Sequence, residues 1–212
     1  MRLLIINPNS DPETNKRIEQ KLLRIFGETL SFDCVCIAEA PKIVSSKEGE
    51  AASMTTMINL IKQGENQYDG FIIACHADPN LDIMREITEK PVVGIAEASY
   101  RIAQMMGNYF SIICPSEKSI SRKYEQTHRY NCNSAMKKVV VAPKDSQDDL
   151  IKAAQAAAEP GIDAIVLGCA NYTPYDKILE QHVKIPVIDG VVCATFIAAG
   201  LAAYQKYKKQ DV

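Results

Sequence analysis

The amino-acid sequence predicts an α/β protein of two pseudo-symmetric lobes, each a four-stranded parallel sheet flanked by helices. Apolar runs of strand length alternate with helical patterns along the whole chain, as in proteins built on parallel sheets. Two of these runs, 71–74 and 165–168, lack polar alternation, which is typical of strands buried on both faces. The chain also repeats itself, because Asp69–Cys75 matches Asp163–Cys169 at an offset of 94 positions.

The first half of the chain contains four expected strand–helix units. Its third helix has a start signal, since Asp78 suits the N-cap position and Pro79 suits the first turn. The expected strands are residues 2–7, 31–38, 69–75 and 91–95, and the expected helices are residues 12–26, 47–63, 79–88 and 96–106.

The second half contains four more units of the same kind. Its third helix has a matching start signal: Thr173 suits the N-cap, Pro174 the first turn, and Asp176 completes the spacing of a capping box. The expected strands are residues 109–114, 137–142, 163–169 and 185–189, and the expected helices are residues 117–129, 146–158, 174–182 and 190–207.

The repeat extends well beyond the two cysteines. Three further pairs of segments match: Leu4–Pro8 with Ser111–Pro115, Asp78-Pro79 with Thr173-Pro174, and Pro91–Gly94 with Pro186–Asp189. The crossover between the halves, near 95–108, is short and has no low-complexity linker. We therefore expect two intimate lobes with the active site in the cleft between them, where small ligands usually bind.

Composition and charge exclude several classes of partner. The net charge is −2 and no basic block occurs, which argues against nucleic acid. The longest apolar stretch, 191–204, is shorter than the roughly 20 residues of a membrane-spanning helix, and the chain starts without a signal core. Seven cysteines without the spacing of a small disulfide scaffold indicate thiols in a reducing cytoplasm. Neither G-x-G-x-x-G nor G-x-x-x-x-G-K occurs, which argues against dinucleotide or P-loop nucleotide use. The expected partner is a small-molecule substrate.

Cys75 and Cys169 carry the chemical hypothesis, because each ends a strand shortly before an expected helix. Ligands of parallel sheets lie at this edge, and N–H groups at a helix start bind an anionic oxygen and lower the pKa of a neighbouring thiol. A thiolate and a thiol, with an ordinary pKa of ~8.5, suit the removal of a proton from one face of a carbon and its return to the other. The alternative role of a small core residue fits matched positions in both halves less well.

Five segments resemble the aspartate/glutamate/hydantoin racemase superfamily, and most of all its hydantoin and allantoin racemase branch. These segments are Ile6–Ser10, Ala74–Pro79, Pro91–Ala98, Val166–Ala170 and Pro186–Gly190. The resemblance implies a mechanism without cofactor or metal, in which Cys75 and Cys169 are the two catalytic groups. It also implies a first lobe of residues 1–96 with 191–212, on which the last helix packs, and a second lobe of residues 97–190.

The resemblance further implies which residues contact the substrate. They are Asn7, Ser10, His76, Ala77, Ser116, Ala170, Asn171 and Gly190. The residues after both cysteines depart from the usual family pattern, which leaves the substrate open. We also expect a homo-oligomer, while the roles of Cys114 and Glu97 stay open.

Several functions remain compatible with these residues. A hydantoin or allantoin-like ring is the preferred substrate, because no arginine occurs among the expected contact residues to bind a free carboxylate. The alternatives are a racemase of aspartate or glutamate, a decarboxylase, which needs only one cysteine, and a maleate isomerase, which uses one cysteine as nucleophile. A non-catalytic two-lobed binding protein gives no reason for matched thiols.

Overall fold

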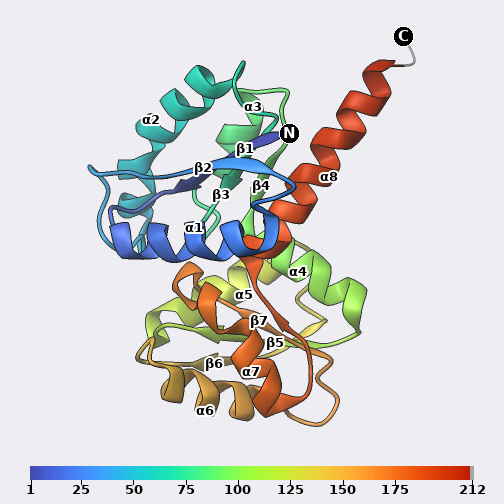
Figure 1. Cartoon of the computed structure of the whole chain (residues 1–212). Coiled ribbons are helices and arrows are strands. Elements are labelled where there is room, and N and C mark those ends of the chain that lie inside the picture. Colours follow the sequence, from blue (N-terminus) through green and yellow to red (C-terminus); the bar gives the residue numbers. More distant parts are fainter. Residues whose placement is uncertain (211–212) are drawn as a thin grey trace. The chain divides into compact units, whose positions relative to one another are not determined.

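The computed structural model describes residues 1–210 and folds them into two α/β units (Figure 1). One unit consists of Met1–Ile95 and the segment from Ala194 onward, and the other consists of Ala96–Cys193. Each unit holds a four-stranded parallel sheet flanked by helices. The predicted fold class is therefore confirmed.

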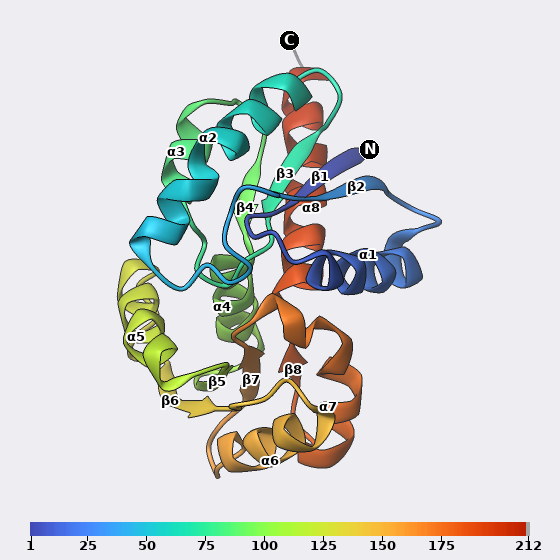
Figure 2. The same cartoon turned by 90° about the vertical axis from the view of Figure 1, so that its left-hand side faces the viewer.

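The sheet of the first unit has the strand order β2-β1-β3-β4. Figure 2 shows α2 and α3 on one side of this sheet and α1 and α8 on the other. The strands are β1 (Arg2–Asn7), β2 (Ser31–Cys36), β3 (Gly70–Ile73) and β4 (Val92–Gly94). The helices are α1 (Pro12–Phe26), α2 (Lys47–Gly64), α3 (Leu81–Glu86) and α8 (Gly190–Gln210), of which the residues from Ala194 belong to this unit.

The central strand β3 is buried on both faces, as its unbroken apolar run predicts. Phe71 and Ile73 pack with Met57 of α2 and Met84 of α3 in one cluster, and Ile72 on the opposite face is also fully buried. Each such side chain contributes about 1.5–3 kcal/mol by leaving water. Burial on both faces therefore holds β3 at one depth and one register in the sheet.

Helix α8 is attached to the first unit by contacts along its length. Phe196 meets Phe26 of α1 edge to face, with ring centroids 4.7 Å apart. Further along, the Lys206 ammonium lies 2.8 Å from a carboxylate oxygen of Asp69. In residues 1–210 no helix, α8 included, is long and apolar enough to cross a membrane.

The second unit repeats the architecture with the strand order β6-β5-β7-β8. Leu150 of α6 and Leu179 of α7 pack on one face of its sheet, while Tyr100 of α4 packs on the other. The strands are β5 (Phe110–Cys114), β6 (Met136–Val141), β7 (Ala164–Leu167) and β8 (Val187–Ile188). The helical elements are α4 (Ile95–Met106), η1 (Glu117–Ser119), α5 (Ile120–Arg129), α6 (Gln147–Ala157), η2 (Ala170–Tyr175) and α7 (Asp176–Val183).

The matched aspartates of the repeat make equivalent hydrogen bonds in the two units. A carboxylate oxygen of Asp69 accepts the backbone N–H of Arg2 at 2.8 Å. A carboxylate oxygen of Asp163 accepts the backbone N–H groups of Asn108 and Tyr109 at 2.7 and 2.9 Å. Each aspartate thus ties the start of the third strand of its sheet to the start of the first.

We predict that Asp163→Ala lowers the free energy of unfolding by about 1–3 kcal/mol, because two backbone donors lose a charged acceptor. Urea unfolding followed by circular dichroism measures this loss. Asp163→Asn is the control, since its amide oxygen still accepts, and we expect a smaller loss. Equal losses for both variants would contradict the role given to these hydrogen bonds.

Candidate active site

Cys75 lies at the carboxyl edge of the first sheet, directly after the central strand. The N–H of Ala74 donates to the carbonyl of Ile6 at 2.8 Å, which extends the β1–β3 ladder by one residue. This bond sets Ala74 and Cys75 beside Asn7, the last residue of β1. The carbonyl of Cys75 then accepts the N–H of Asp78 at 2.9 Å, so the chain turns immediately after the thiol.

Asn7 is fully buried at this edge and has a polar atom with unused hydrogen-bonding capacity. Its side-chain oxygen accepts the N–H of Asn9 at 3.4 Å. Its Nδ2 group has no hydrogen-bond partner among the described residues. A buried donor left in this way costs about 1–3 kcal/mol, so a ligand that supplies an acceptor would recover that energy.

The remaining contact residues expected from the first unit have different environments. Ser10 is half-buried in the loop before α1 and donates its backbone N–H to Pro41 at 3.3 Å. His76 is only 3% exposed, so it is a buried residue rather than a surface one. Ala77 is half-buried.

The start of α3 differs from the predicted one. Asp78 is not the N-cap, because α3 begins at Leu81 and Asn80 stands at its N-cap position. Asp78 and Asn80 both have positive φ angles, 46° and 57°, in the left-handed region. The carboxyl group of Asp78 instead lies against Gly94, where a Cβ atom would be 2.5 and 2.7 Å from its two oxygens.

Cys169 has the equivalent position in the second unit. The N–H of Gly168 donates to the carbonyl of Ile113 at 2.7 Å and extends the β5–β7 ladder. Cys169 thereby follows the central strand beside Cys114, the last residue of β5. Its carbonyl accepts the N–H of Tyr172 at 3.1 Å, a turn of the same span as the one after Cys75. All seven cysteines lie in the described residues, and none of them forms a disulfide.

The segment after Cys169 also departs from the predicted helix start. The 3-10 helix η2 begins at once with Ala170, which is buried, so Thr173 is inside a helical turn and not an N-cap. The Thr173 hydroxyl donates to a carboxylate oxygen of Asp189 at 3.2 Å. The half-buried Asn171 donates its side-chain amide to Asp145 at 3.3 Å.

The last two expected contact residues belong to the second unit and stand at the starts of η1 and α8. Ser116 precedes η1, and its hydroxyl lies 3.0 Å from that of Ser119. The backbone carbonyl of Ser116 accepts the Cys114 thiol at 3.5 Å. Gly190 is the buried first residue of α8, next to Asp189, whose Oδ1 accepts the N–H of Val191 at 2.8 Å.

Burial dominates the electrostatics around Cys169. It raises the pKa of the Cys169 thiol, while the nearby backbone N–H of Asn171 and the Lys123 ammonium lower it by less. Burial also raises the pKa of Cys114. The helix start therefore acts in the expected direction, but the net shift at Cys169 is upward, because desolvation penalises the thiolate more.

Lys123 is a candidate functional residue that sequence reasoning missed. It lies on α5, is 3% exposed, and donates its ammonium to the side-chain oxygen of Gln126 at 3.3 Å. The pattern of α5 gives no sign that this lysine is buried near a thiol, since a lysine between polar neighbours reads as solvated.

The candidate residues divide into two half-sets. Asn7, Ser10, Cys75, His76 and Ala77 belong to the first unit. The set in the second unit is Lys123, Ser116, Cys169, Ala170, Asn171 and Gly190. Within residues 1–210 no group of three or more His, Cys, Asp or Glu side chains is arranged to hold a metal ion.

Comparison with known proteins gives consistent matches over nearly the whole chain. Residues 3–198 match the family model described as Asp/Glu/Hydantoin racemase. The chain is 30% identical to a hydantoin racemase of Pseudomonas sp. (strain NS671), covering 93% of this chain and 84% of that one, and 27% identical to a hydantoin racemase of Paenarthrobacter aurescens, covering 98% and 94%. Its fold superposes on the allantoin racemase of Klebsiella pneumoniae with a TM-score of 0.90 at 25% identity, over 97% of this chain and 89% of that one.

We predict that Lys123→Met raises the pKa of Cys169 further, because a cation that favours the thiolate is removed. The pH profile of Cys169 alkylation by iodoacetamide, followed by peptide mass spectrometry, should move to higher pH. Lys118→Met, on an exposed lysine of η1, is the matched control and should leave the profile in place. An unchanged profile in Lys123→Met would show that the ammonium does not act on this thiol.

Proposed function

The chain belongs to the Asp/Glu/hydantoin racemase family and is a racemase, and we propose that it inverts a carbon next to a carbonyl by proton transfer through Cys75 and Cys169. One observation carries the proposal. Both thiols follow the central strand of their sheet by the same extension of the ladder and precede a turn of the same span. Equivalent placement in two halves suits a reaction whose forward and reverse directions exchange the roles of acid and base.

The proposed reaction moves one proton off the carbon and one proton back on. A thiolate takes the hydrogen from one face of the carbon and becomes a thiol, while the electron pair of the C–H bond passes to the neighbouring carbonyl as an enolate. The second thiol then donates its proton to the opposite face and becomes a thiolate. The two cysteines have exchanged protonation states, and the reverse reaction starts from that state.

The preferred substrate is a five-membered hydantoin ring, including allantoin-like rings. Its chiral carbon is next to a ring carbonyl, which acidifies the hydrogen and holds the enolate charge. The Nδ2 group of Asn7, which has no hydrogen-bond partner among the described residues, supports this choice, since it can donate to a ring carbonyl. The names of the hydantoin racemases similar to this chain support it as well.

We predict that the protein racemises single enantiomers of 5-substituted hydantoins in deuterated water. Optical rotation should decay to zero, and NMR should show deuterium gained at the chiral carbon at the same pace. Decay of rotation without deuterium gain would contradict proton exchange at this carbon. Release of carbon dioxide, or a cis–trans shift of maleate, would instead point to the decarboxylase or isomerase alternatives.

We predict that Cys75→Ser and Cys169→Ser each lower the racemisation rate by about 10²–10⁴-fold, because a serine hydroxyl cannot take over the acid–base role of the thiol. Each variant should still exchange the hydrogen of one enantiomer with solvent, through its remaining thiol. Cys36→Ala is the matched control, since Cys36 also ends a strand, and it should stay near the wild-type rate. Full racemisation by either serine variant would refute the pair.

A racemase of aspartate or glutamate is the second candidate, and Lys123 is the observation in its favour. This buried ammonium lies near enough to Cys169 to lower its pKa, so it offers a cation for a free carboxylate. The hydantoin assay, repeated with single enantiomers of aspartate and glutamate, separates the two candidates. Turnover of the open-chain acids alone would replace the ring substrate.

A further inference from the structure

We propose that Asp78 is a positioning residue for Cys75. Its carboxylate occupies the space beside Gly94 that a side chain would otherwise fill, and this contact holds the turn that follows the thiol. The activity readout below rests on the proposed function, whereas the structural readout does not.

The second unit connects its thiol loop to the end of the neighbouring strand through a hydroxyl–carboxylate pair. Thr173, on η2 after Cys169, donates its hydroxyl to Oδ1 of Asp189 at 3.2 Å. The same oxygen accepts the N–H of Val191 at 2.8 Å, at the start of α8. The carboxylate of this pair therefore comes from residue 189, directly after β8, and the hydroxyl comes from the loop.

In the first unit the carboxylate belongs to the loop residue, Asp78, and not to the residue at the end of the neighbouring strand, Gly94. Asp78 matches Thr173 and Gly94 matches Asp189, both at an offset of 95 positions. A Cβ atom on Gly94 would lie 2.5 and 2.7 Å from the carboxylate oxygens of Asp78, so these oxygens fill the space that a side chain at residue 94 would need. The loop residue thus supplies the carboxylate, and the strand-end residue must be glycine.

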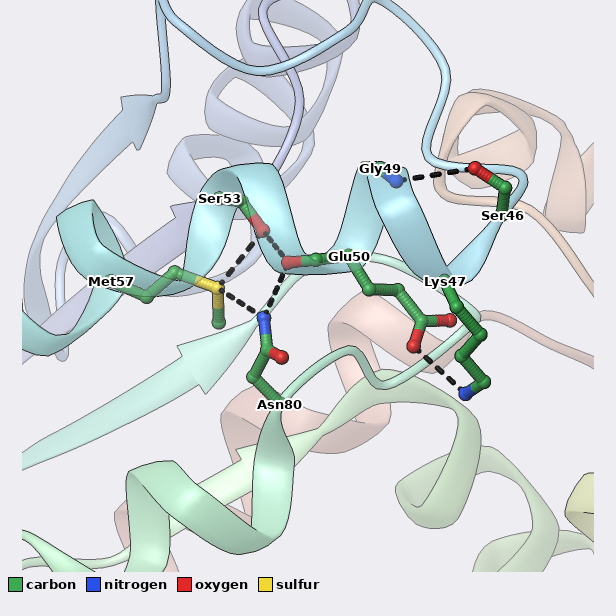
Figure 3. Close-up of polar contacts among 7 residues, drawn as sticks. All are labelled: Ser46, Lys47, Gly49, Glu50, Ser53, Met57 and Asn80. Carbon is green, nitrogen blue, oxygen red and sulfur yellow. Dashed lines mark hydrogen bonds and ion pairs between the residues drawn. The ribbon is translucent and has the colours of Figure 1, made fainter.

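The backbone conformation of the loop after Cys75 is consistent with a segment that contacts from neighbouring elements hold in place. Asp78 is 1% exposed and has a φ of 46°, and Asn80 has a φ of 57°. Non-glycine residues keep such angles where surrounding contacts require them. Asn80 supplies a second anchor, since its side-chain amide donates to the carbonyl of Glu50 at 2.8 Å and lies 3.6 Å from the sulfur of Met57 (Figure 3).

The two anchors connect the short segment that follows the thiol to different elements of the first unit. Asn80 joins the segment to α2, and Asp78 joins it to the end of β4. Between Asp78 and the thiol runs the turn in which the N–H of Asp78 donates to the carbonyl of Cys75 at 2.9 Å. In this proposal the buried carboxylate of Asp78, packed against Gly94, fixes the backbone of Cys75 through this one turn.

The test transplants the pair of the second unit into the first. Asp78→Thr alone removes the carboxylate, and Gly94→Asp alone forces a side chain into the space that Asp78 occupies. The double variant D78T/G94D recreates the arrangement of Thr173 and Asp189. Asp82→Thr, on an exposed aspartate of α3, is the matched control, and Asp78→Asn is the conservative variant of the same shape.

Hydrogen–deuterium exchange of residues 75–80 is the readout that does not depend on activity. We expect Asp78→Thr to speed exchange of this segment by about tenfold or more, and D78T/G94D to return it to the wild-type rate. If Asp78→Thr does not fold, D78T/G94D still tests the proposal. The double variant folds and exchanges at the wild-type rate only if a carboxylate at position 94 can replace the one at position 78. Exchange that is unchanged in Asp78→Thr, or not restored in the double variant, would overturn the proposal.

Racemisation kinetics give a second readout, because substitution of a residue with a merely structural role would not lower kcat while leaving KM unchanged. We expect Asp78→Thr to lower kcat by about ten- to a hundredfold, with KM within about twofold, because a misplaced thiol affects the chemical step more than binding. Asp78→Asn and D78T/G94D should stay within about threefold of wild type, and Asp82→Thr should not differ from it. A wild-type protein that racemises no substrate would refute the proposed function, while the exchange measurements would still decide the role of Asp78.

Discussion

The register of the central strand in each sheet is the constraint on which the candidate site depends. β3 and β7 are hydrogen-bonded on both sides and buried on both faces, so neither can slip without exposing apolar side chains. The bonds from Ala74 to Ile6 and from Gly168 to Ile113 then end both ladders at the same level. Cys75 and Cys169 therefore reach the carboxyl edge of their sheets because the apolar strands before them are fixed in register.

The two halves keep the same backbone and use different side chains to stabilise it. The carboxylate that borders the thiol loop comes from Asp78 in the first unit and from Asp189 in the second. The environment of Cys169 includes the ammonium of Lys123, and burial raises the pKa of its thiol. A racemase tolerates such asymmetry, because the complexes that a chiral protein forms with two enantiomers are diastereomers and not mirror images of each other.

Much of the fold and part of the candidate site follow from local patterns in the chain. The alternation of apolar runs and helical patterns predicted both four-stranded sheets, and burial of Phe71–Ala74 follows from its lack of polar alternation. Cap chemistry was a weaker guide, since Asp78 and Thr173 match helix starts in composition but contact Gly94 and Asp189 instead. A short polar side chain can cap its own helix or bond elsewhere, and its local sequence is the same in both cases.

The sequence by itself determined the succession of strands and helices along the chain, the repeat, and the place of two thiols at strand ends. These features depend on hydrophobic periodicity and on neighbours in the chain. Only the tertiary structure decided that Lys123 is buried, that Asn7 keeps a buried donor without a partner among the described residues, and that Asp78 lies against Gly94. These contacts join residues distant in sequence, and packing selects them from many side chains of equal local propensity.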